Sequence, residues 1–273
     1  MALFPILLAA QDKSLVILHL NDTHSRIEPF PEGGGSNAGR GGVVRHDAYI
    51  NEVRRENKNN TLLFHCGDFV QGTPYFNLFK GETEMSIANL MKVDAACLGN
   101  HEFDNGLVQL ASMLKIAKFP FVATNLDFTG TPLEGLTKKY VIIKRNGLKI
   151  GVIGLTISPE GLVAKKNCEG VKYLDPVESA NNMADFLKIK EKCDIIVCIS
   201  HLGYYADDKR DGDVKVAKNS RFIDIVLGGH THTFMPEPKR VQNLDGKEVV
   251  INQTGAYGVY IGRLDVALEK IAE

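Results

Sequence analysis

The sequence predicts a layered α/β protein. Short runs rich in Val, Ile and Leu recur along the 273 residues, and their continuous apolar character is typical of strands buried on both faces. Amphipathic windows between many of these runs favour helices that pack on a sheet. The length suits one large α/β domain or two small ones, and the chain contains neither an internal repeat nor a Pro/Ser-rich linker between two cores.

The apolar runs define the expected strands. In chain order they are Leu15–Leu18, Thr61–Phe64, Ala95–Leu98, Phe121–Ala123, Tyr140–Ile143, Ile150–Ile153, Ile195–Ile199, Ile223–Leu227 and Val249–Ile251. The turn dipeptide Asn146-Gly147 joins two of these runs, so that pair should form an antiparallel hairpin. The clearest helical faces are Leu107, Leu110, Ala111 and Leu114, and then Val177, Ala180, Met183, Ala184 and Leu187.

One segment, residues 33–42, is strongly biased toward glycine. It lacks the Gly-Lys-Ser/Thr that closes a Walker A loop, and it does not match G-x-G-x-x-G. A flexible loop that leads into a helix from Val43 is therefore favoured over a phosphate cradle.

The charge balance excludes several classes of function. The 32 basic and 33 acidic residues give a formal net charge of -1, so there is no strong cationic field for a nucleic-acid polymer or an anionic membrane. No apolar run approaches the roughly 18–20 residues of a membrane-spanning helix. We therefore expect a globular protein with no membrane span and no nucleic-acid polymer as its partner.

The N-terminus begins with an apolar stretch that ends at Ala10 and is followed by polar residues. This pattern resembles the second half of a secretory signal, although no Lys or Arg precedes it. A misplaced start codon and an artificial extension are the alternatives. We interpret residues 1–10 as a signal-peptide remnant and expect a periplasmic or secreted protein.

The five cysteines indicate neither a zinc ribbon nor a thioredoxin-like motif, because no two have C-x-x-C spacing. Cys66, Cys97 and Cys198 lie inside apolar runs, where free cysteine behaves as a small hydrophobic residue. A bridge between Cys193 and Cys198 is compatible with their spacing alone.

Residues that can bind metals follow several of the expected strands, where α/β folds usually place ligands. The clusters are Asn21-Asp22-Thr23-His24, Gly67-Asp68, Gly99-Asn100-His101-Glu102-Phe103-Asp104, Ser200-His201 and Gly228-Gly229-His230-Thr231-His232. A short cluster on its own has an ordinary explanation, such as a helix cap for Asp68. A His-x-His after a buried strand, by contrast, fits chelation better than packing.

Together the clusters supply a set of nitrogen and oxygen donors. They are Asp22, His24, Asp68, Asn100, His201, His230 and His232. This set is too large for one tetrahedral ion and suits two divalent ions such as Mn, Zn, Co or Fe. The lack of cysteine in the set argues against a structural zinc site. The remaining histidines, His19, His46 and His65, are interpreted as structural.

The order D-x-H, G-D, G-N-H-E, H and G-H-x-H resembles the calcineurin-like metallophosphoesterase superfamily. Within it the sequence is most similar to the 5′-nucleotidase family, which also includes UDP-sugar hydrolases and 2′,3′-cyclic-nucleotide 2′-phosphodiesterases. The segments that carry this narrower resemblance are Leu18–His24, Cys66–Thr73, Gly99–Asp104 and Gly255–Gly258. The resemblance extends from about residue 14 to the end.

The resemblance implies a four-layer α/β/β/α sandwich with two metal ions at one edge of the central sheets. Asp68 would bridge the ions. The implied ligands of one ion are Asp22, His24 and His232, and those of the other are Asn100, His201 and His230.

His101 and Asp104 would form a catalytic dyad and would not bind metal. In this role His101 stabilises charge on the phosphoryl oxygens or protonates the leaving group, and Asp104 orients it. The implied activity is dimetal-dependent hydrolysis of a small-molecule phosphate ester, with nucleotides as the first candidates. The alternative is a stand-alone phosphodiesterase or phosphatase for other esters, for example cyclic nucleotides or UDP-sugars.

The family also carries a second, C-terminal domain that recognises the nucleobase. Residues 11–273 correspond to the catalytic domain, and the chain stops after Tyr260–Val266, where the family's connecting segment would begin. The recognition domain is either a separate partner protein, a part cut from a longer chain, or absent from an enzyme with another substrate. A split enzyme is slightly favoured over a stand-alone one. A metal-binding module without catalysis is disfavoured by the intact donor set.

Overall fold

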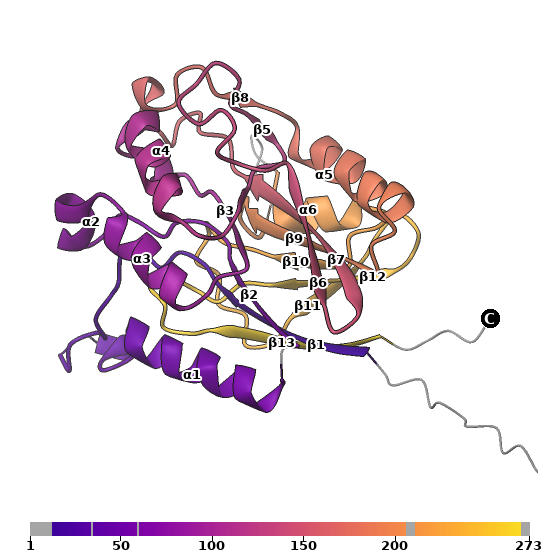
Figure 1. Ribbon diagram of the computed structural model, residues 1–273, viewed down its shortest axis with the longest axis horizontal. Coiled ribbons are helices and arrows are strands. Elements are labelled where there is room, and N and C mark those ends of the chain that lie inside the picture. Colours follow the sequence, from indigo (N-terminus) through magenta and orange to yellow (C-terminus); the bar gives the residue numbers. More distant parts are fainter. Residues whose placement is uncertain (1–12, 34, 59, 206–210, 269–273) are drawn as a thin grey trace, which may run out of the picture.

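Two β-sheets stand face to face between two layers of helices (Figure 1). The computed structural model describes residues 13–268, apart from positions 34, 59 and 206–210. The expected signal-peptide remnant, residues 1–10, lies outside the described residues. No helix in the described part of the chain combines the length and the apolar character needed to cross a membrane.

The first sheet contains the opening strands of the chain and its last described strand. Its order is β13–β1–β2–β3–β4. The strands are β1 (Lys13–Leu20), β2 (Thr61–His65), β3 (Ala95–Cys97), β4 (Phe121–Val122) and β13 (Gly262–Leu268). Strands β1 to β4 are parallel, whereas β13 pairs antiparallel with β1. The sequence did not predict β13, because an edge strand in which exposed Arg263 and Asp265 alternate with buried Leu264 has no continuous apolar run.

The second sheet has the order β11–β12–β10–β9–β7–β6. Its strands are β6 (Tyr140–Arg145), β7 (Leu148–Thr156), β9 (Ile195–His201), β10 (Ile225–Leu227), β11 (Lys239–Gln242) and β12 (Glu248–Asn252). The hairpin of β6 and β7 confirms the turn expected at Asn146-Gly147. The expectation of burial on both faces is wrong for β6, whose apolar side chains are only half-buried because it is an edge strand. A small separate sheet pairs β5 (Leu126–Asp127) with β8 (Lys172–Tyr173).

The helices cover the two outer faces. On the side of the first sheet lie α1 (Val43–Glu56), α2 (Pro74–Phe79), α3 (Glu82–Leu90) and α4 (Gly106–Ile116), and on the opposite side lie α5 (Pro176–Asp185) and α6 (Asp213–Lys218) (Figure 1). The short helices are η1 (Gly35–Asn37), η2 (His101–Phe103), η3 (Lys165–Asn167) and η4 (Phe186–Lys190). The helix expected after the glycine-rich loop begins at Val43, as predicted.

Three apolar layers fill the spaces between the four layers of secondary structure. In β1, Val16, Leu18 and Leu20 pack toward the helices of the first sheet, whereas Leu15 and Ile17 pack between the two sheets. A third cluster lies between the second sheet and helices α5 and α6. This arrangement confirms the α/β/β/α sandwich.

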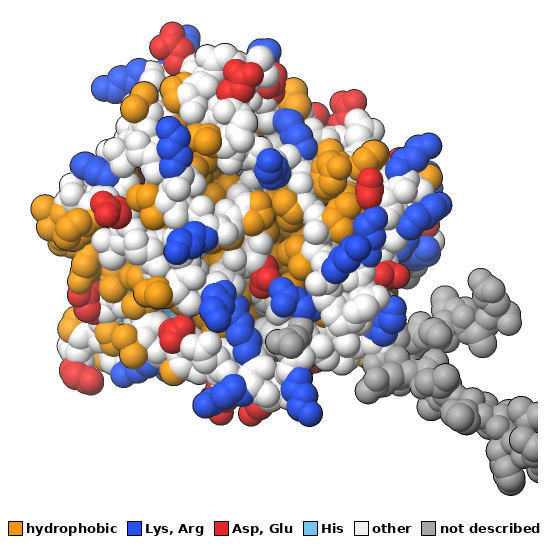
Figure 2. Space-filling view, in the orientation of Figure 1, with side chains coloured by type: hydrophobic (Ala, Val, Ile, Leu, Met, Phe, Trp, Pro, Cys, Tyr) orange, Lys and Arg blue, Asp and Glu red, His pale blue; other side chains and the backbone are white. Residues whose placement is uncertain are grey.

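Neither the distribution of surface charge nor the cysteines point to a particular binding partner or cross-link. Basic and acidic side chains are scattered together over the face drawn in Figure 2. All five cysteines are free, so the bridge between Cys193 and Cys198 does not form. Cys66, Cys97 and Cys198 are buried in the apolar layers, as their sequence context indicated.

The backbones of the two sheets come into contact where the segment after β4 meets β7. The amide of Thr124 donates to the carbonyl of Gly154 at 2.7 Å, and the amide of Gly154 donates to the Thr124 hydroxyl at 3.0 Å. A Cβ atom added at Gly154 would lie 2.2 Å from the carbonyl oxygen of Val122. Only glycine allows this close approach of two backbones.

We therefore expect Gly154→Ala to lower the free energy of unfolding by about 1–3 kcal/mol, measured by urea titration. The matched control is Gly151→Ala in the same strand, where the new Cβ would meet the side chains of Leu187 and Cys193 at 3.0 and 3.2 Å. Those side chains can move, so the control should lose less stability. Equal losses in the two variants would contradict this explanation.

Candidate metal centre

All the residues expected to bind metal lie at one edge of the sandwich, where parallel strands of both sheets end. Asp22 and His24 follow β1, Asp68 follows β2, and Asn100 follows β3. From the second sheet, His201 is the last residue of β9, and His230 and His232 follow β10. The facing sheets therefore bring side chains from opposite halves of the chain into one site.

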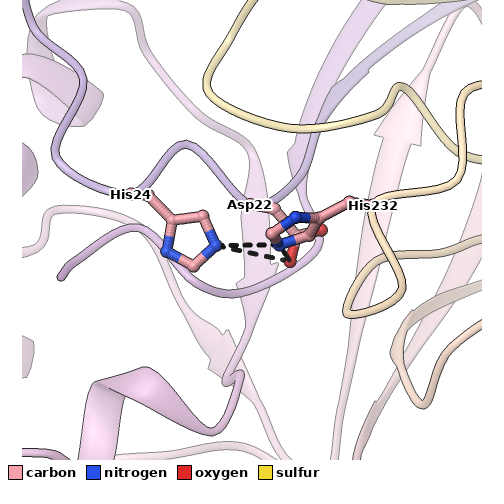
Figure 3. Close-up of side chains that lie close together, drawn as sticks. All are labelled: Asp22, His24 and His232. Atoms are coloured by element: carbon pink, nitrogen blue, oxygen red, sulfur yellow. Dashed lines mark hydrogen bonds and ion pairs between the residues drawn. The ribbon is translucent and has the colours of Figure 1, made fainter. Parts of the chain in front are cut away.

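The first group of donors consists of Asp22, His24 and His232 (Figure 3). The Nε2 atoms of the two histidines are 3.0 Å apart. Oδ1 of Asp22 lies 3.3 Å from Nε2 of His232 and 3.9 Å from Nε2 of His24. Asp22 and His24 are buried, whereas the His232 side chain is 38% exposed. These three side chains converge closely enough to share one ion.

The second group consists of Asp68, His201 and His230. Nε2 of His201 lies 3.0 Å from Oδ2 of Asp68. Nδ1 of His230 lies 2.9 Å from Oδ1 of Asn100, which brings the neutral amide into the same group.

Asp68 lies between the two groups. Its Oδ2 atom is 3.9 Å from Nε2 of His24 in the first group and 3.0 Å from Nε2 of His201 in the second. A carboxylate in this position can contact ions in both groups at once.

The donor histidines are oriented by backbone carbonyls. Nδ1–H of His24 donates to the carbonyl of Val70 at 3.2 Å, and Nδ1–H of His201 donates to the carbonyl of Cys66 at 2.6 Å. The hydrogen bonds assign the proton to Nδ1, so in the neutral ring Nε2 carries the lone pair that a metal needs. Nε2 of His201 is fully buried and faces the Asp68 carboxylate at 3.0 Å. The donor set therefore fits a cation.

The centre has an excess of buried negative charge. Burial opposes protonation of His201, but Asp68 and Asp22 raise the pKa of His201 to about 10. Burial also acts to raise the pKa of Asp68, yet His201, His101 and His24 hold it well below its usual range. A site that attracts a proton this strongly also attracts a metal cation, which would replace that proton.

His101 and Asp104 lie at the more open side of the centre. Nδ1–H of His101 donates to Oδ2 of Asp104 at 2.8 Å, and the two side chains are 32% and 29% exposed. This hydrogen bond is the main reason why the pKa of His101 is raised. His101 is also close enough to His24 and Asp68 to share an ion with them. With Nδ1 engaged by Asp104, Nε2 is the nitrogen directed to a ligand or substrate.

Glu102 has a positioning role that the sequence did not assign. Its buried carboxylate accepts hydrogen bonds from the backbone amides of Asp68, Phe69 and Gly99. Burial, followed by repulsion from Asp68, raises the pKa of Glu102 to about 7. Glu102 thus ties the loop after β2 to the loop after β3. The sequence feature that could have indicated this role is that Glu102 is a carboxylate inside the Gly99–Asp104 cluster but outside the set of expected metal ligands.

Asn21 joins the loop after β1, which carries Asp22 and His24, to the segment after β12. Its Nδ2 donates to Oδ2 of Asp22 at 2.6 Å and to the carbonyl of Gly255 at 2.7 Å. Its Oδ1 accepts from the amide of Thr254 at 2.9 Å. Asn21 therefore holds a donor carboxylate and links the two sheets.

The other histidines do not belong to the donor groups. His19 is completely buried, His46 bonds the carbonyl of Gly258 at 2.6 Å, and His65 lies 3.0 Å from the Thr23 hydroxyl. None of the three belongs to a potential metal group in the described chain.

Comparison with known proteins agrees with this geometry. The chain is 34% identical over 281 residues to a snake venom 5′-nucleotidase of Crotalus adamanteus, a match that covers 96% of this chain and 46% of that protein. It is 28% identical to the trifunctional nucleotide phosphoesterase protein YfkN of Bacillus subtilis, covering 94% of this chain and 18% of that protein. The chain thus spans about half the length of the 5′-nucleotidase relatives it matches, and less of YfkN.

Solved structures resemble the fold closely. The 5′-nucleotidase precursor of Thermus thermophilus superposes with a TM-score of 0.84 at 34% identity, over 94% of this chain and 52% of that one. The calcineurin-like phosphoesterase YfkN of Bacillus subtilis superposes with a TM-score of 0.76 at 28% identity, over 95% of this chain and 86% of that one. Residues 15–234 match the calcineurin-like phosphoesterase family, and the chain belongs to this family.

Proposed function

We propose that this chain hydrolyses phosphate esters at a centre of two divalent metal ions, with nucleotides as its substrates. The observation that supports this proposal most directly is the pair of donor groups that share Asp68. Asp22, His24 and His232 hold one ion, and Asn100, His201 and His230 hold the other. Nitrogen and oxygen donors without sulfur suit Mn, Zn, Co or Fe.

The donor set is adapted to an anionic substrate. Bound divalent ions would act as Lewis acids toward the phosphate oxygens and would lower the pKa of a water molecule. Asp68 contributes one negative charge to both groups, and Asn100 is neutral, which limits repulsion of the incoming phosphate. His201 and His24 are held in place by backbone carbonyls, so little reorganisation is needed when substrate arrives.

His101 is the residue proposed to act on the substrate itself. Asp104 orients its ring and favours the protonated form, because the hydrogen bond between them raises the pKa of His101. The protonated ring can stabilise charge on the phosphoryl oxygens through Nε2–H, or it can transfer this proton to the leaving alkoxide. The partial exposure of both side chains is compatible with direct access of substrate.

Nucleotides are proposed on the basis of the relatives. Both the venom 5′-nucleotidase and the trifunctional phosphoesterase carry nucleotides in their names. Tyr257 supports a substrate of this kind, because its ring is 38% exposed and lies 5.6 Å from the ring of His232. The second candidate is a phosphodiesterase or phosphatase for other esters. A periplasmic or secreted location belongs to the same proposal and is supported by relatives named as venom proteins.

A second part that recognises the base is proposed to act together with this catalytic domain. Residues 11–273 form the catalytic domain in this view, and relatives of about twice the length support a second part. Base recognition supplies much of the binding energy for a nucleotide, so the catalytic domain alone should show a high KM.

The proposed activity is tested with a panel of esters. Metal-free protein is reconstituted with Mn²⁺, Zn²⁺ or Co²⁺ and assayed on AMP, a UDP-sugar, a 2′,3′-cyclic nucleotide, p-nitrophenyl phosphate and bis-p-nitrophenyl phosphate. We expect turnover with at least one metal and none in excess chelator. Failure to cleave any of these esters with any of the metals would overturn the proposal.

The role of His101 is tested by His101→Ala. Because the ring is proposed to contact substrate and not metal, the variant should retain two ions while kcat falls by about 10²–10⁴-fold. Elemental analysis and steady-state kinetics measure the two quantities. The contrasting variant is His201→Ala, which should lose metal because it removes a buried donor. Loss of metal from His101→Ala would assign that residue to the ligands instead.

The role of a base-recognising part is tested by adding the separately produced C-terminal domain of a full-length relative. We expect kcat/KM for AMP to rise, because the added domain binds the base. Hydrolysis of p-nitrophenyl phosphate serves as the control and should not change, since this substrate has no base. Unchanged kinetics for AMP would favour a stand-alone enzyme.

A further inference from the structure

A small cavity lies directly behind the loop that carries Asp22 and His24. It has a volume of about 30 Å³ and is lined by the loop after β1, the end of β2, and helices α1 and α3. Most of its wall is apolar, but six polar residues also line it, namely Thr23, Ser25, Arg26, His46, His65 and Glu84. The donor groups of the metal centre use none of these six.

Five polar side-chain atoms of the lining residues lack partners. In the described part of the chain, Ser25 Oγ, Arg26 Nε, His65 Nδ1 and both carboxylate oxygens of Glu84 are buried without a hydrogen bond. Glu84 is only 4% exposed. A buried carboxylate without a partner is strongly unfavourable, and so is a buried guanidinium N–H. Five such atoms around one cavity therefore indicate an additional occupant.

The chemistry of the five atoms identifies that occupant as water. The carboxylate of Glu84 can only accept hydrogen bonds when ionised, and Arg26 Nε can only donate. Ser25 and His65 can do either, depending on the hydroxyl rotamer and the ring tautomer. Water donates and accepts at once, and a volume of about 30 Å³ has room for it.

Residues that line the cavity contact or belong to the loop of Asp22 and His24 on both sides of His24. Nε2 of His65 lies 3.0 Å from the hydroxyl of Thr23, which separates Asp22 from His24 in the chain. Ser25, the residue after His24, lines the cavity itself. Water that bonds Ser25 and His65 is therefore connected to both residues that flank His24, directly to Ser25 and through His65 to Thr23.

The loop needs such support because its backbone is strained. Asp22, His24 and Ser25 have φ values of 51°, 50° and 53°, in the left-handed region that residues other than glycine rarely adopt. Backbone hydrogen bonds to Gly67, Asp68 and Phe69 hold one side of the loop. The cavity lies between this loop and helix α3, and Glu84 is the only acidic residue among the described residues that line it.

We propose that this cavity holds ordered water and that Glu84, acting through it, is a positioning residue for the loop of Asp22 and His24. Glu84 accepts from the water, and the water bonds Arg26, Ser25 and His65. His65 in turn fixes Thr23. This inference rests on the proposed metal role of Asp22 and His24, and it adds a residue from a helix that contributes no donor.

The proposal is tested first without substrate or metal. Hydrogen exchange of the backbone amides of Asp22, His24 and Ser25 is measured in metal-free protein for Glu84→Ala, Glu84→Gln and the control Glu82→Ala. Glu82 lies on the same helix but is exposed. We expect faster exchange at these amides in Glu84→Ala, partial recovery in Glu84→Gln because its amide oxygen still accepts, and no change in the control.

Calorimetric titration with Mn²⁺ supplies the second readout. The affinity of Glu84→Ala should be about 10–100-fold weaker, as is typical when a group that orients metal ligands is removed. Glu84→Gln should lie between Glu84→Ala and the parent. Unchanged exchange and affinity in Glu84→Ala would overturn the proposal. Faster exchange over the whole fold, without recovery in Glu84→Gln, would also overturn it and assign Glu84 to general packing.

The water itself is tested by a high-resolution crystal structure of the metal-loaded protein. Ordered water within hydrogen-bonding distance of Glu84 and Arg26 Nε is expected. An empty cavity, or a direct Arg26–Glu84 ion pair in its place, would overturn the proposal. Since the exchange experiment needs no catalysis, a protein that cleaves no ester but loosens its loop in Glu84→Ala would refute the proposed function and leave this inference intact.

Discussion

Two buried carboxylates at the junction of the sheets set the constraint on which the rest of the centre depends. Asp22 and Asp68 both lie within 4.0 Å of Nε2 of His201, and neither has solvent to screen its charge. Such a pair is unfavourable without cations or many donors. The protein supplies donors on every side: Asn21 and the amide of His230 bond Asp22, and the amide of His101 bonds Asp68. The histidine nitrogens converge on the space between the two carboxylates.

The backbone is bent to bring these groups together. Asp22, His24, Asp68, His230 and His232 all have φ between 50° and 72°, although none is glycine. Strain of this kind persists only where surrounding contacts hold it. Glu102 provides one such contact by binding three amides from two loops. Gly99 provides another by the absence of a side chain, since a Cβ there would lie 2.1 Å from Oδ1 of Asp68. The donors are therefore preorganised by residues outside the donor groups.

The sequence predicted the parts of the molecule that have a local signature. Buried parallel strands appear as apolar runs, and donors appear as polar clusters directly after them, because parallel strands end at one edge of a sheet. Strand β13 has neither signature, since it is an edge strand whose partner, β1, is about 250 residues away in the chain. The partners of Glu102 were hidden for the same reason: Asp68 and Phe69 are 34 and 33 residues away. The cavity behind Thr23 is lined by four segments that are far apart in the sequence. No local pattern in one of these segments indicates that the other three lie beside it.

Each donor group combines the two sheets, and this links metal binding to the stability of the sandwich. Asp22 and His24 come from the first sheet and His232 from the second, while Asp68 and Asn100 meet His201 and His230 in the same way. An ion in either group therefore connects elements that otherwise meet mainly through apolar packing. Because unfolding separates the donors, ions that bind the folded state stabilise it by an amount that grows with the logarithm of metal concentration. The same ions neutralise the repulsion between Asp22 and Asp68, so the charge that destabilises the metal-free junction is the charge that binds the metal.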